Sequence, residues 1–82
     1  MRLELYQEVA LNQDFSQHSL KKGDIATVVD YVPHPQGGEE GCILELFNAV
    51  GDSIAVVTVP ASSIEAIRPD DILSVRRLAQ AS

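Results

Sequence analysis

The hydrophobic and polar residues of this chain alternate over short segments, which is the two-residue period of a β-strand. These segments are four to eight residues long, rich in Val, Ile and Leu, and separated by turn-forming residues. No long segment has the 3.6-residue period of an amphipathic helix. We therefore expect an all-β fold, a small five-stranded barrel, with strands at residues 4–11, 25–32, 42–47, 54–59 and 72–75.

A Lys-Lys-Gly-Asp turn at residues 21–24 leads directly into the second expected strand. Gly23 can adopt a positive φ at low cost, and the carboxylate of Asp24 can accept hydrogen bonds from neighbouring backbone amides. Within the strand that follows, the adjacent Val28 and Val29 interrupt the alternation. They indicate either a strand buried on both faces or a β-bulge.

The connections between the strands differ in character. We expect a polar loop at residues 12–19, anchored by Phe15, and a long loop rich in proline and glycine at residues 33–41. Gly51-Asp52 supplies a hairpin turn between the third and fourth strands. The chain leaves the fourth strand through a proline, and we expect one short 3-10 turn at residues 60–64.

Length and charge limit the possible functions. The 82 residues suffice for one domain, which we expect at residues 1–77, with residues 78–82 as a frayed tail. No apolar run approaches the ~20 residues of a membrane helix, and the first residues lack the apolar region of a signal peptide, so we expect a cytoplasmic protein. The net charge of −6 disfavours nucleic acid and favours a basic protein as partner.

Candidate catalytic and metal-binding groups are few. Cys42, the single cysteine, and His34 could form a thiol and imidazole pair, but their spacing does not bring them together, and a cysteine that opens an apolar strand is usually a small buried hydrophobe. Zinc needs about four clustered Cys or His ligands, which this chain does not offer. The turn at residues 37–41 lacks the lysine of a phosphate-binding loop. We expect no catalytic residue, no metal site and no cofactor.

Several short motifs are spread over most of the chain. They are Leu5–Leu11, Leu20–Asp24, Thr27–Tyr31, Gly38–Gly41 and Val59–Ser62. Together they resemble a bacterial family known as domain of unknown function 4926, and the resemblance extends from Leu5 to about Val75. It implies an SH3-like barrel, leaves the activity open, and hints at a companion role beside a small partner protein, as an antitoxin has beside its toxin.

The main functional hypothesis is a non-enzymatic, acidic protein-binding module, antitoxin-like or accessory to another protein. Its expected contact residues lie around the longest loop, where prolines meet aromatic, imidazole and acidic side chains; they are Tyr31, Pro33, His34, Glu39 and Glu40. Long loops carried by a rigid sheet are common interaction sites. The expected partner is a basic protein rather than a membrane.

An RNA-binding accessory domain is the alternative hypothesis. The turn at residues 21–24 is similar to the ribosomal-loop motif of transcription and translation factors, known as the KOW motif. Lys21, Lys22, Arg76 and Arg77 form the two basic pairs that would contact phosphates. Unpaired strand edges would also allow copies of the chain to associate, and the sequence leaves the oligomeric state open.

Overall fold

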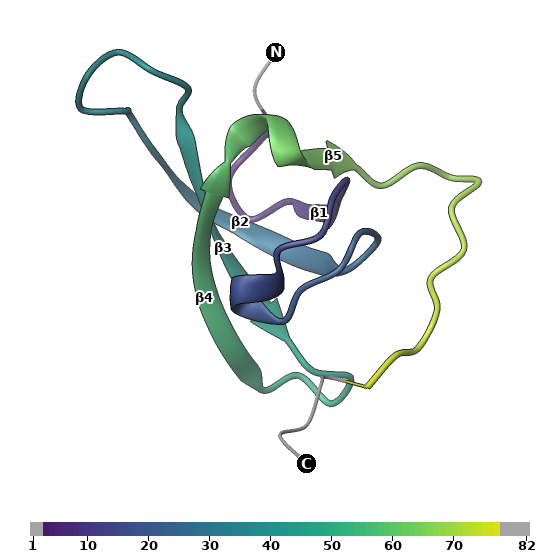
Figure 1. Ribbon diagram of the computed structural model, residues 1–82. Coiled ribbons are helices and arrows are strands. Elements are labelled where there is room, and N and C mark those ends of the chain that lie inside the picture. Colours follow the sequence, from purple (N-terminus) through teal and green to yellow (C-terminus); the bar gives the residue numbers. More distant parts are fainter. Residues whose placement is uncertain (1–2, 78–82) are drawn as a thin grey trace.

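The computed structural model describes residues 3–77, which form five strands and two 3-10 turns (Figure 1). The strands are β1 (Glu8–Leu11), β2 (Ile25–Val32), β3 (Gly41–Phe47), β4 (Ser53–Pro60) and β5 (Ile64–Ala66). They form a sheet in the order β4-β3-β2-β1-β5, and every neighbouring pair is antiparallel. The all-β, five-stranded prediction is confirmed. Hydrogen bonds do not close the sheet into a barrel, because β4 and β5 are its two ends.

The central strands lie where the sequence places them, whereas the first strand is shorter than expected. β2 has its expected bounds, and β3 and β4 extend by one residue or two beyond theirs. β1 begins at Glu8 instead of residue 4, because a turn precedes it. In this turn the Gln7 amide donates to the Glu4 carbonyl (3.3 Å), and Tyr6 has a φ of 65°. A positive φ is incompatible with extended strand geometry.

The bulge expected from the adjacent valines is present in β2. Its register against β3 shifts between Val28 and Asp30, so that Val29 is the additional residue. The Val28 side chain is completely buried, whereas Val29 is half-buried. A bulge bends the strand that carries it, and here it separates the half of β2 that pairs with β1 from the end that reaches the long loop.

The turn at residues 21–24 forms as its residue types predict. Gly23 has a φ of 94°, and the Asp24 carboxylate accepts a hydrogen bond from the Lys21 amide (2.8 Å). The Gly23 amide in turn donates to the carbonyl of Leu11 at the end of β1 (2.8 Å). One hydrogen bond therefore closes the turn internally, and another joins the turn to the first strand.

Two 3-10 turns are present where one was expected. η2 (Ala61–Ser63) confirms the turn after β4, and the buried Ser63 hydroxyl donates to the Pro60 carbonyl (2.5 Å). η1 (Ser16–His18) lies inside the segment expected as an irregular loop, next to the buried Phe15. Within residues 3–77 no helix is long and apolar enough to cross a membrane.

The expected final strand at residues 72–75 is wrong. The fifth strand is β5, which pairs with β1 immediately after η2 and occupies the free edge of β1. A turn then follows, in which the Asp71 carboxylate accepts from the Arg68 amide (2.7 Å). Beyond it the chain leaves the sheet without regular structure, and the side chains of Ile72 and Val75 are 93% and 92% exposed.

The core lies on the inner face of the curved sheet. β3 contributes every second residue to it, and η1 with its flanking residues covers part of this face (Figure 1). Its buried hydrophobic members are Val9, Leu11, Phe15, Leu20, Ala26, Val28, Cys42, Leu44, Leu46, Val57, Val59 and Ile64. The anchoring role expected for Phe15 is thus confirmed.

Replacing Leu44 by alanine tests the importance of this core. Leu44 is fully buried in β3 and pairs with Val28 on one side and Val57 on the other. The cavity should lower the free energy of unfolding by about 2 to 5 kcal/mol, measured by urea denaturation. As the control, Val50→Ala at an 81% exposed position should change it by about 0.5 kcal/mol or less. Similar midpoints for the two variants would contradict this assignment of the core.

Candidate partner-binding site

The loop between β2 and β3 extends away from the body of the sheet as a narrow arm (Figure 1). We define the arm as residues 33–40. His34 organises it, because its Nδ1 accepts a hydrogen bond from the Gln36 amide (3.1 Å) and its carbonyl accepts one from Gly37 (3.2 Å). Its imidazole ring lies so close to Gly38 that a Cβ there would meet ring atoms at 3.0 to 3.1 Å. A glycine at this position therefore lets the arm fold back on the histidine.

The base of the arm is fixed to η2. The Ser62 amide donates to Glu39 Oε2 (2.6 Å), and the Ala61 amide donates to the Glu40 carbonyl (2.9 Å). The hydrogen bonding with Ser62 lowers the pKa of the Glu39 carboxyl below its usual value, so that this group is ionised at neutral pH. The negative charge of Glu39 is thereby held beside the end of β4.

A shallow, open groove of about 500 Å³ lies between the arm and the end of β4. Apolar atoms form most of its wall, and the side chains include three prolines, one imidazole and one carboxylate. The residues that line it are Val32, Pro33, His34, Pro35, Glu39, Gly41, Thr58, Val59 and Pro60. We call this site the arm groove. An apolar trough with one fixed negative charge is suited to binding an extended peptide segment that carries a positive charge.

The five predicted contact residues divide between two places. Pro33, His34 and Glu39 line the arm groove, whereas Tyr31 and Glu40 line a separate hollow of about 400 Å³ beside η2 and β5. Tyr31 pairs with Cys42 in the sheet and therefore points toward the core side.

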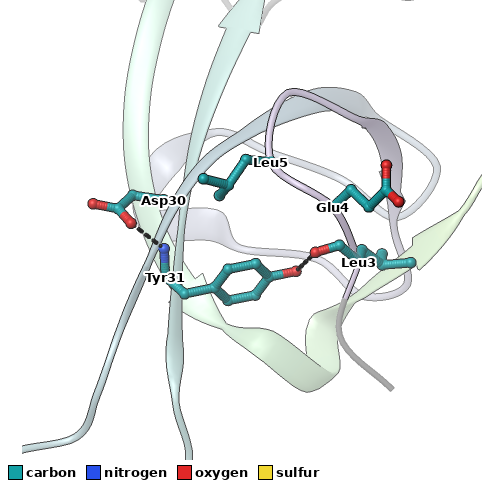
Figure 2. Close-up of a pocket in the computed structure, with 5 residues that line it drawn as sticks. All are labelled: Leu3, Glu4, Leu5, Asp30 and Tyr31. Carbon is teal, nitrogen blue, oxygen red and sulfur yellow. Dashed lines mark hydrogen bonds between the residues drawn. The ribbon is translucent and has the colours of Figure 1, made fainter.

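Tyr31 also holds the first described residues of the chain. Its hydroxyl donates to the Leu3 carbonyl (2.8 Å), and its amide donates to the Asp30 carboxylate (2.8 Å), as Figure 2 shows. With Glu4 and Leu5 these residues surround a third hollow, of about 360 Å³. The role of Tyr31 in this structure is to attach the segment before β1 to β2.

Sequence reasoning missed the β4 side of the arm groove. Thr58 and Pro60 reach it because β3 pairs with β4 in a register that places Gly41 opposite Pro60. A Cβ at Gly41 would contact the Thr58 methyl group at 3.3 Å, so the absence of a side chain there keeps the floor of the groove open. The sequence signal is weak, since it consists of one glycine and one proline on different strands.

Of the four basic residues in the RNA hypothesis, Arg76 lies beside the turn that carries Lys21 and Lys22. Arg76 Nε and Nη2 donate to the two carboxylate oxygens of Asp24 (2.7 and 2.5 Å), and Nη2 also donates to the Ser19 carbonyl (3.0 Å). The guanidinium group thus lies beside the turn that carries Lys21 and Lys22. Asp24 offsets its charge, and the two form an ion pair rather than an open cationic surface.

The same ion pair changes the acidity of Asp24. Partial burial is the largest single influence and raises the pKa of the carboxyl, but the hydrogen bonds from Arg76 and the Lys21 amide, together with nearby positive charge, outweigh it. The net pKa lies below the ordinary value of 3.8. Asp24 is therefore ionised at neutral pH and attaches residue 76 to the start of β2.

Cys42 and His34, the thiol and imidazole considered from the sequence, lie in different environments. The Cys42 side chain is fully buried in the core, and His34 is exposed on the arm. Burial, with a smaller contribution from the charge of Glu40, raises the pKa of the Cys42 thiol to about 11. Within residues 3–77, no group of three or more His, Cys, Asp or Glu side chains is arranged to hold a metal ion.

Comparison with known proteins assigns the chain to a family. A family model described as a domain of unknown function, DUF4926, matches residues 5–66. The chain belongs to the DUF4926 family. Neither the curated proteins nor the solved structures gave a match to it. The matched DUF4926 region ends with the last residue of β5, so that it contains all five strands and the arm but not Arg76 or Arg77.

The ion pair beyond the DUF4926 match should depend on pH. Arg76→Gln should lower the free energy of unfolding at neutral pH by about 1 kcal/mol or less, because the pair lies at the surface. The folded-state pKa of Asp24 is depressed, so its contribution is complete above the ordinary value of 3.8 and is lost as the pH falls through the folded value. The difference between the variant and the parent should therefore shrink below about pH 4 in chemical denaturation.

Arg77→Gln is the matched control, since no hydrogen bond or ion pair of its side chain appears within residues 3–77. A pH-independent effect of Arg76→Gln, or an equal effect of both substitutions, would contradict the ion-pair assignment.

The buried thiol of the DUF4926 domain should react slowly. At neutral pH a thiol with a pKa of about 11 is ionised in only about one molecule in 10⁴, and the sheet shields Cys42 from reagent. Labelling by a disulfide reagent should be at least about 100-fold slower in the folded protein than in denaturant, where a thiol regains its ordinary pKa near ~8.5. Equal rates would show an accessible thiolate and reopen the case for catalysis by Cys42.

Proposed function

We propose that the DUF4926 domain is an SH3-like barrel with an open seam between β4 and β5. Three features support this assignment: five antiparallel strands, the order β4-β3-β2-β1-β5, and the 3-10 turn that connects β4 to β5. The sheet also curves so that β4 and β5 enclose one core (Figure 1). In a small barrel the interior is filled by side chains, which leaves the outer surface for function.

On this fold we propose a non-enzymatic protein-binding module whose contact site is the arm groove. The observation that carries the proposal is the groove itself, where Pro33, Pro35 and Pro60 meet. Proline has no side-chain conformational freedom to lose on binding, and attachment of Glu39 to Ser62 fixes one side of the site in advance.

The partner that fits this site is a basic protein presenting an extended segment. The net charge of −6 would attract such a partner over a distance, and the ionised Glu39 would receive a Lys or Arg side chain at the rim of the groove. In the cell, we propose an antitoxin-like or accessory role, in which the domain covers a basic surface of its partner. The cytoplasm is the compartment that we propose for it.

RNA binding is the weaker proposal, because the ion pair with Asp24 offsets the charge of Arg76. The two proposals differ in their dependence on salt. Phosphate contacts by Lys21, Lys22 and Arg77 would weaken steeply as the salt concentration rises, and a Lys21→Gln/Lys22→Gln variant would flatten the slope. If the protein retards an RNA oligonucleotide in a gel and these substitutions abolish the retardation, RNA binding would replace protein binding as the proposed function.

The test of protein binding is affinity capture with the tagged protein, followed by calorimetric titration of the purified partner. Val32→Arg should weaken this binding by about tenfold or more, which corresponds to about 1.4 kcal/mol, because the new side chain fills the arm groove and repels a basic segment. Val50→Arg makes the same change at an exposed position in the β3–β4 turn and should leave the affinity unchanged. Equal affinities for the two variants, or capture of no partner, would overturn the proposal.

A further inference from the structure

The imidazole of His34 supports the tip of the arm through an acceptor atom that exists in only one of its charge states. Nδ1 accepts the hydrogen bond from the Gln36 amide (3.1 Å), so it carries no proton, and the proton of the neutral ring must then lie on Nε2. In the cationic ring both nitrogens carry a proton, and neither can accept. The hydrogen bond at the tip of the arm therefore requires a neutral His34.

The folded shape of the tip depends on the position of this ring. The Gly37 amide donates to the His34 carbonyl (3.2 Å), and ring atoms lie 3.0 to 3.1 Å from the place that a Cβ of Gly38 would occupy. Within residues 3–77, no other side chain forms a hydrogen bond with residues 35–38. The tip has no sheet neighbour either, so the imidazole is its principal support.

We propose that His34 is a pH-sensitive switch, which folds the tip of the arm when it is neutral and releases the tip when it is protonated. Protonation places an N–H on Nδ1, directly opposite the N–H of Gln36, so a hydrogen bond is replaced by two opposed donors. The ring must then turn away from Gln36 and leave its contact with Gly38. Histidine side chains change charge between about pH 5 and 8, which places the switch near physiological pH.

The groups that face His34 across the arm groove do not oppose this change. β2 and β4 contribute only side chains that do not titrate: Val32, Thr58, Val59 and Pro60. Glu39, on the arm itself, is the one charged residue among the described residues that line the groove, and its carboxylate attracts an imidazolium. Glu40 lines the separate hollow beside η2 and β5.

The base of the arm does not respond to the same change in pH. The hydrogen bonding with Ser62 keeps the pKa of the Glu39 carboxyl below the ordinary value of 4.5, so this group stays mostly ionised at about pH 5. Its hydrogen bond with the Ser62 amide therefore persists while His34 becomes charged. The switch is confined to the tip.

Release of the tip would weaken the binding of a basic partner, a consequence that rests on the protein-binding function proposed above. The groove wall formed by Pro33 and Pro35 would lose its fixed position, so a partner would have to order it on binding. The imidazolium would also compete with a Lys or Arg side chain of the partner for Glu39. Binding should therefore be tighter at neutral pH than under mildly acidic conditions.

The test records NMR spectra of the free 82-residue protein at about pH 7.5 and about pH 5. At the higher pH, the imidazole nitrogen shifts should identify the Nε2–H form, and a nuclear Overhauser effect should connect the His34 ring with the α protons of Gly38. At the lower pH this effect should be lost, and the Gln36 amide proton should acquire the large temperature coefficient of an amide without an internal hydrogen bond. A proton on Nδ1 at the higher pH, or an effect of equal strength at both, would overturn the proposal.

Two variants separate the switch from a general effect of pH. In His34→Asn the side-chain carbonyl can accept from the amide two residues on, as in an Asx turn, but it does not titrate, so the Gln36 amide should stay hydrogen-bonded at both pH values. His18→Asn is the matched control, because His18 is the other histidine of the chain and lies on η1, away from the arm. A transition that persists in His34→Asn, or that His18→Asn removes, would overturn the proposal. Since all spectra are recorded without a partner, the result is independent of whether the arm groove binds one.

Discussion

The burial of one face of β3 is the constraint on which the rest of this structure depends. Cys42, Leu44 and Leu46 alternate along the strand and are all buried, while β2 and β4 pair with it on either side. A domain of this length has few other side chains to remove from water. A shift of one residue in either pairing would turn these three outward, so the register of three strands is determined together. The bulge at Val29 allows β2 to satisfy this register and that of β1 at once.

The position of the arm groove follows from this register. β2 and β3 diverge beyond Val32 and Gly41, and the chain between them has no sheet neighbour with which to pair. It becomes ordered through two local devices, the folding of the arm around His34 and the hydrogen bond that Glu39 accepts from Ser62. The groove therefore has one rigid wall, formed by β4, and one wall formed by a loop that is attached at its base.

The parts of the fold that local residue types determine could be predicted from the sequence. The strand β2 and the turns at Gly23 and Gly51 follow from β-branched residues and from glycines with positive φ. The start of β1 could not be predicted, because it depends on contacts with a distant part of the chain. Tyr6 adopts its positive φ in a turn where the Tyr6 amide donates to the Val28 carbonyl and the Gln7 carbonyl accepts from the Val28 amide. Ile72–Val75 resembles a strand in composition, but Ile64–Ala66 occupies the edge of β1 first.

Only one side of the candidate site could be predicted from the sequence, namely the side formed by the loop. Pro33, His34 and Glu39 are recognisable because they crowd into one polar loop, and each lines the arm groove. Thr58 and Pro60 complete it through strand register, which a single sequence does not reveal. Tyr31 stands in the same stretch of sequence but on the other side of the sheet, since neighbouring strand residues alternate in direction.

The attachment of Arg76 to Asp24 lies outside the region that defines the family, and it joins residues that are 52 positions apart. Since this attachment consists of a surface ion pair and a few hydrogen bonds, dissolved ions compete with it directly. Raising the ionic strength should therefore loosen the attachment and make residues 72–75, which have no regular structure, easier for a protease to reach. Cleavage within residues 72–75 would leave the five strands and their pairing intact.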